Sequence, residues 1–130
     1  MIGVDTNILL RLFAQDDIVQ SPKANAILAS FTVENPGWIS VAALLELIWV
    51  TTHTFRADRT QVAAIVQSLV SNPHLVVDSS DAVIRALSLY RRGNAEFADC
   101  LISSLGRSAG CTKTLTFDGK AAKTAEMILA

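Results

Sequence analysis

Residues 1–13 read MIGVDTNILLRLF, and this stretch decides the fold. Ile2 to Val4 is a short apolar run, and the residues Asp5-Thr6-Asn7 that follow it are all favoured at helix N-caps or in the first helical turn. Apolar side chains then recur at helical spacing from Ile8 to Phe13. A strand, a tight turn and a helix are therefore expected in immediate succession.

The rest of the chain repeats this alternation of short strands with longer helices. Strands are expected at Trp38–Ser40, His74–Val77 and Thr112–Thr116. Helices are expected in six stretches, which are Ser21-Pro22 to Ser30, Val41 to about His53, Thr60 to Asn72-Pro73, Ser79-Ser80-Asp81 to Gly93, Phe97–Ala109 and Lys120–Glu126. Four or five strands among six or seven helices are typical of an α/β fold with a parallel sheet and helices on both faces.

Composition limits the class of protein. A chain of 130 residues is long enough for one core, so a single domain over residues 1–130 is expected. No apolar run is long enough to span a membrane, and the first residues lack the basic region of a secretory signal, which favours the cytoplasm. The net charge of −1 argues against coating of nucleic acid by electrostatics alone, so any such contact has to be local.

Four acidic residues stand out because each lies within or beside apolar sequence. Asp5 and Asp118 each follow a predicted strand and could cap the next helix. Glu46 and Asp99 interrupt apolar helical segments, where an unpaired carboxylate is costly. Ligands of parallel α/β sheets bind beyond the carboxyl ends of the strands, so the four side chains could converge on one crevice.

Converging carboxylates require a cation. They repel one another at neutral pH, and a divalent ion among them relieves the repulsion. Ligation by oxygen alone favours Mg²⁺ or Mn²⁺, the ions best suited to phosphate-ester chemistry. Asp5, Glu46, Asp99 and Asp118 are therefore candidate metal ligands and catalytic residues.

Five segments give the chain a resemblance to a known family. They are Val4-Asp5-Thr6-Asn7, Glu46-Leu47-Ile48-Trp49-Val50, Tyr90-Arg91-Arg92-Gly93, Phe97-Ala98-Asp99-Cys100-Leu101-Ile102 and Thr116-Phe117-Asp118. In this order they resemble PIN-domain nucleases, most closely the VapC-type toxins of bacterial toxin–antitoxin pairs. The resemblance covers essentially the whole chain and implies a three-layer α/β sandwich around a short parallel sheet.

The resemblance also implies an activity and partners. It implies an Mg²⁺- or Mn²⁺-dependent endoribonuclease, a homodimer and neutralisation by a small antitoxin protein. The acidic quartet of the family matches Asp5, Glu46, Asp99 and Asp118, with Asp118 more distant from the metal. Thr6 and Thr116 match hydroxyl positions at the rim, and Ser40 is a weaker candidate; structural roles for these three hydroxyls are equally compatible with the sequence.

Basic residues near the motifs are candidate phosphate contacts. Arg11, Lys113 and Lys120 lie close to the acidic motifs in the sequence. Arg91 and Arg92 are better explained as complements of a helix C-terminus. None of the five is assigned to the site.

Two other functions stay open at this point. A phosphoacceptor receiver module is also a small α/β domain with strand-end acids, but it needs an adjacent acidic pair where this chain has Asp5 alone, and its acids do not lie within a helix as Glu46 does. A catalytically inactive PIN fold that only binds is the second alternative, and the presence of all four acids disfavours it.

Overall fold

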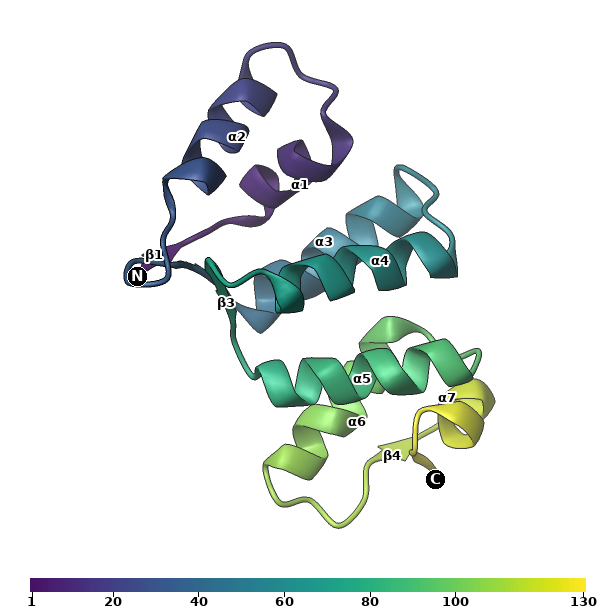
Figure 1. Ribbon diagram of the computed structural model, residues 1–130. Coiled ribbons are helices and arrows are strands. Elements are labelled where there is room, and N and C mark those ends of the chain that lie inside the picture. The colour runs from purple at the N-terminus through teal and green to yellow at the C-terminus, as the bar shows by residue number, and fades with distance from the viewer. The chain divides into compact units, whose positions relative to one another are not determined.

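Short strands alternate with helices along the chain, as Figure 1 shows for the computed structural model, which describes residues 1–130. The elements are β1 (Ile2–Gly3), α1 (Thr6–Ala14), α2 (Gln20–Ser30), β2 (Gly37–Ile39), α3 (Val41–His53), α4 (Arg59–Ser71), β3 (Leu75–Val77), α5 (Ser80–Arg92), α6 (Phe97–Ser108), β4 (Leu115–Thr116), α7 (Gly119–Thr124) and β5 (Ile128–Leu129). This order confirms the α/β fold with parallel strands flanked by helices.

The internal contacts of the chain divide it into two compact units, Met1–Asp78 and Ser79–Ala130. Each is described by itself. The sequence led us to expect a single domain with three layers. Both expectations depend on how the two units are arranged, and both stay predictions.

The first unit is built on the sheet β1-β2-β3, whose strands are all parallel. The ladder continues past the strand ends, because the amide of Val4 donates to the Trp38 carbonyl (2.9 Å) and the amide of Asp78 to the Ile39 carbonyl (2.8 Å). Asp5, Ser40 and Asp78 therefore all follow their strands at the same carboxyl edge of this sheet.

Helices α1 to α4 supply the core of the first unit. Helix α1 packs against α2 and α3, and α4 packs against β3. The largest fully buried side chains of this unit are Ile39 of β2 and Leu9, Leu44, Leu47, Val62 and Val66 of α1, α3 and α4. The spacing of the helical residues places one face of each of these helices in the core.

The second unit is organised around the pair α5 and α6, with α7 and the parallel strands β4 and β5 beside it. Its core contains Val83, Ala86, Phe97 and Leu101, all at most 2% exposed. Tyr90 and Phe97 meet edge to face, with ring centroids 5.7 Å apart, and so join the end of α5 to the start of α6. No helix of the chain is both long and apolar enough to cross a membrane.

Two expected helix starts are wrong. Helix α4 begins at Arg59 with Asp58 as its N-cap, where Thr60 was expected, because Asp58 and Gln61 form a reciprocal capping box. Helix α2 begins at Gln20, before Ser21-Pro22, because the side chain of Asp17 accepts hydrogen bonds from the amides of Val19 and Gln20. Pro22 is accommodated because amides of the first helical turn have no partner within the helix.

Several element lengths also differ from expectation. Strand β4 covers Leu115–Thr116, not Thr112–Thr116, and α7 ends at Thr124, before Glu126. Helix α6 ends at Ser108, one residue earlier than expected. These are shifts at element ends, and the order of strands and helices is as predicted.

Candidate metal-binding acidic site

Asp5 lies directly after β1 and is the N-cap of α1. Its Oδ1 accepts the amide of Thr6 at 2.8 Å. The side chain is exposed, and no protein group donates to its second oxygen, Oδ2. One oxygen therefore serves the helix, and the other is available to a ligand.

Glu46 lies on α3, and its side chain is exposed. Helix α3 buries Leu44, Leu47 and Ile48 on one face and turns Glu46 outward, so this carboxylate avoids the cost of an apolar interior. The buried hydroxyl of Thr6 donates to the Ala43 carbonyl at 3.4 Å, one turn before Glu46. This bond ties the residue after Asp5 to the part of α3 that carries Glu46.

Asp99 lies in the first turn of α6 and is half-buried, at the border between the buried face of that helix and solvent. Burial raises the pKa of its carboxyl group, and the negative charges of Asp118 and Glu96 raise it further. Asp99 therefore lies near two negative charges of the same unit, one at the N-cap of its own helix and one at the N-cap of α7.

Glu96 is the acidic residue that the sequence reasoning missed. It is the N-cap residue of α6, it is exposed, and its side chain makes no capping hydrogen bond. Its spacing from Asp99 was the available signal, because residues three apart on a helix lie on the same side. Glu96 is thus an additional candidate for the acidic site.

Asp118 follows β4 and is the N-cap of α7. Its Oδ1 accepts the amides of Lys120 at 2.8 Å and Ala121 at 3.4 Å. Its own amide donates to the Thr116 hydroxyl at 3.0 Å, which fixes the turn between strand and helix. As at Asp5, no protein group donates to Oδ2.

The structure thus brings Asp99, Asp118 and Glu96 into electrostatic contact within the second unit, and it places Asp5 and Glu46 on contacting elements of the first. Within neither unit are three such side chains close enough to form a ready-made metal cage. That the four predicted acids act together stays a prediction.

The donor set nevertheless fits a hard divalent cation. All of these ligands are carboxylate oxygens, which Mg²⁺ and Mn²⁺ prefer. Asp5 and Asp118 each keep one oxygen free of protein hydrogen bonds. Burial and then the charges of Asp118 and Glu96 raise the pKa of Asp99, and a cation would relieve the part that comes from the charges.

The three candidate hydroxyls have structural partners. Thr6 is buried and bonds to α3, Ser40 caps α3 by accepting the amide of Ala43 at 3.0 Å, and Thr116 accepts the amide of Asp118. Each of them positions an element that carries an acidic residue. They support the site and need no further role.

A comparison with protein families places this geometry in context. A family model described as the PIN domain matches residues 2–127. The chain belongs to the PIN-domain family. PIN domains are generally nucleases and typically bind Mg²⁺, in agreement with the carboxylate donors described above. A search of curated proteins found no match.

Membership of the PIN family removes one alternative function. A phosphoacceptor receiver is a different family, and its acidic pair has no counterpart beside Asp5, where the next residues are Thr6 and Asn7. The resemblance to the VapC-type toxins is finer than the family match, and it belongs with the proposal that follows.

Proposed function

We propose that this PIN-domain protein is an Mg²⁺- or Mn²⁺-dependent endoribonuclease that hydrolyses RNA phosphodiester bonds. The observation that carries the proposal is the position of the half-buried Asp99 near Asp118 and Glu96: burial raises the pKa of its carboxyl group most, and these two negative charges raise it further. A protein accepts such repulsion where a cation is to be bound. The family match supplies the link from a cation to nuclease chemistry.

Each acidic residue has a defined part in this proposal. Asp5, Glu46 and Asp99 hold the ion most directly, and Asp118 contributes its free oxygen or acts through water. The bound ion would polarise the phosphoryl oxygen and lower the pKa of the attacking water. The caps at Asp5 and Asp118 hold these two side chains still, because each fixes one carboxylate oxygen on a helix N-terminus.

We also propose the biological setting of a toxin–antitoxin pair, with the chain as the toxin, a homodimer in the cytoplasm. The segments that resemble VapC-type toxins support this role. The cysteines fit a reducing compartment, because Cys100 is a buried thiol, Cys111 is an exposed thiol and neither forms a disulfide. The partner would be a small antitoxin with an arginine that pairs with the acidic site, since guanidinium groups bind carboxylates bidentately.

The activity can be tested on the purified full-length protein. Labelled RNA is incubated with Mg²⁺, with Mn²⁺, with Ca²⁺ and with chelator, and the RNA ends are sequenced. Cleavage is expected with Mg²⁺ or Mn²⁺ and not with chelator, and Ca²⁺ should substitute poorly. Metal-independent cleavage would refute the mechanism, whereas RNA binding without any cleavage would favour the inactive, binding-only PIN fold.

A further inference from the structure

Charge is distributed unequally between the two units of the chain. Residues 1–78 contain four Lys and Arg against seven Asp and Glu, and residues 79–130 contain seven Lys and Arg against five Asp and Glu. Two of those five acids, Asp99 and Asp118, are candidate metal ligands. The second unit is therefore basic, although the net charge of the whole chain is −1.

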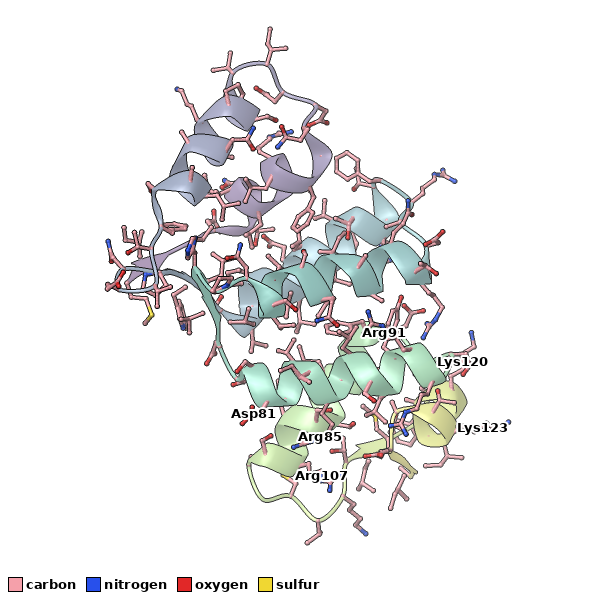
Figure 2. All side chains as sticks on the ribbon, viewed as in Figure 1. Asp81, Arg85, Arg91, Arg107, Lys120 and Lys123 are labelled. Carbon is pink, nitrogen blue, oxygen red and sulfur yellow. The ribbon has the colours of Figure 1, made fainter.

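Three of these basic residues form what we call the basic strip, defined as Lys120, Lys123 and Arg92. Lys120 is two residues after Asp118, and Lys123 lies one turn further along α7, so the two lysines share a side of that helix. Figure 2 shows both of them projecting from α7. The strip thus begins beside a candidate metal ligand.

Arg92 joins the strip from another element. A depression of about 270 Å³ is lined by Arg92 and Gly93 at the end of α5, by Lys123 and Thr124 of α7, and by Leu89 and Glu126. Glu126 forms an exposed ion pair with Arg107 at 3.7 Å, and Arg107 itself does not line this depression. Two cations from different helices therefore face one hollow.

The walls of this depression are fixed in place. Gly93 and Thr124 approach so closely that a Cβ on Gly93 would lie 2.5 Å from the Thr124 Cβ. The Thr124 hydroxyl accepts a hydrogen bond from the amide of Ala95 at 3.0 Å and donates one to the Lys120 carbonyl at 3.0 Å. These contacts hold α7 against the link between α5 and α6, so the spacing of Lys123 and Arg92 is built into the fold.

The cationic groups of the strip are available. The ammonium groups of Lys120 and Lys123 form no hydrogen bond or ion pair within the protein, and the guanidinium of Arg92 uses only its Nε, which donates to the Ser88 carbonyl at 3.3 Å. That bond confirms the expected role of Arg92 at a helix C-terminus and leaves both Nη groups of Arg92 for a ligand. Arg11, by contrast, is already engaged by Asp16 at 3.0 Å.

We propose that the basic strip binds consecutive phosphates of the RNA strand on one side of the bond that is cut. This rests on the proposed function and adds the path of the substrate to it. The strip begins two residues from Asp118, and its rigid hollow suits a phosphate held by Arg92 and Lys123 together. The contacts are to the sugar–phosphate backbone, so they add affinity with no sequence preference.

The test measures RNA binding in the absence of cleavage. A fluorescein-labelled oligouridylate of about 12 nucleotides, a length that single-strand grooves cover, is titrated with the full-length protein in chelator. Anisotropy gives the dissociation constant at several salt concentrations between about 0.05 and 0.2 M. For single strands, each phosphate contact adds about 0.7 to the slope of log affinity against log salt concentration. Relative to about 1 M salt, one such contact therefore raises the affinity roughly fivefold at about 0.1 M salt.

The variants are K120Q, K123Q, R92Q and their combination. Each single variant should lower affinity about fivefold and the slope by about 0.7, and the triple variant should lower the slope by about 2. R92K keeps the charge and should retain most of the binding. K113Q is the matched control. Lys113 was also a candidate phosphate contact from the sequence, but this exposed lysine of the same unit lines a different depression, with Arg107 and Cys111, and lies outside the strip.

The outcomes separate the strip from the proposed function. Loss of affinity in the strip variants with K113Q unchanged supports the strip, with thermal unfolding confirming that the variants fold. Equal losses in K113Q, an unchanged salt slope in the triple variant, or no measurable binding by the wild type would overturn it. The nuclease activity is tested separately by Mg²⁺-dependent cleavage. Cleavage with no effect of the strip variants on binding would overturn the strip alone, and strip-dependent binding without cleavage would overturn the nuclease activity alone.

Discussion

The double role of Asp118 can be resolved by comparing Asp118→Ala with Asp118→Asn. The cap of α7 depends on Oδ1, which accepts two backbone amides, and an asparagine side chain can accept the same bonds. Alanine cannot, so Asp118→Ala should lower the free energy of unfolding by about 1 kcal/mol relative to Asp118→Asn. For a chain of 130 residues this corresponds to a melting temperature lower by roughly 3 to 5 °C.

The asparagine variant itself should stay within about 1 kcal/mol of the wild type without metal, because two effects of the lost charge oppose each other. The repulsion of Asp99 disappears, which stabilises, and the favourable interaction with the N-terminus of α7 weakens, which destabilises.

Magnesium then separates the structural role from the functional one. At a concentration 100 times its dissociation constant, Mg²⁺ should stabilise the wild type by about 2.7 kcal/mol, and it should stabilise both variants much less. Thermal unfolding followed by circular dichroism, with and without Mg²⁺, measures all of these differences. Equal stability of the Ala and Asn variants would refute the cap, and a full Mg²⁺ response in Asp118→Asn would refute its part in metal binding.

Three further changes test other parts of the structure. Because the pKa of Asp99 is raised in the folded protein, the free energy of unfolding should fall as pH rises from the ordinary pKa of 3.8 through the raised one, and this loss of stability is complete at neutral pH. Asp99→Asn should remove the fall in urea unfolding measured from about pH 4 to about pH 7 without metal. An unchanged pH profile in this variant would contradict the assignment. Asp58→Ala removes the capping box of α4 and should lower the free energy of unfolding by about 1 kcal/mol. RNA cleavage per folded molecule should stay unchanged, and a large loss of activity would count against the assigned site. Gly37→Ala should cost about 1–3 kcal/mol in chemical denaturation, because its Cβ would lie 2.5 Å from a ring carbon of Phe31, and wild-type stability would show that the ring moves freely.

The positions of Asp5 and Asp118 could be predicted from sequence because the signals are local. An aspartate after a short apolar run and before helical spacing has one structural solution, the N-cap, and both residues adopt it. The start of α4 could have been predicted in the same way, since Asp58 is followed three residues later by Gln61 and Thr60 is followed by Ala63.

The environments of Glu46 and Asp99 could not be predicted from their neighbours along the chain. Glu46 lies between Leu45 and Leu47, yet Leu47 faces the core and Glu46 faces solvent, because adjacent residues of a helix point in different directions. The negative environment of Asp99 depends in part on Asp118, which is nineteen positions away in the sequence, and such a contact leaves no local pattern.

The central claim is that the acidic residues hold the ion required to cut RNA. The most direct measurement is single-turnover cleavage of a labelled RNA by the wild type and by Asp99→Asn, each with Mg²⁺ and with chelator. Asp99→Asn preserves the size of the side chain and removes a charge that the fold does not need, so a correctly folded variant is expected. We predict Mg²⁺-dependent cleavage by the wild type and none by Asp99→Asn. Cleavage by the variant at the wild-type rate, or full wild-type activity in chelator, would contradict the claim.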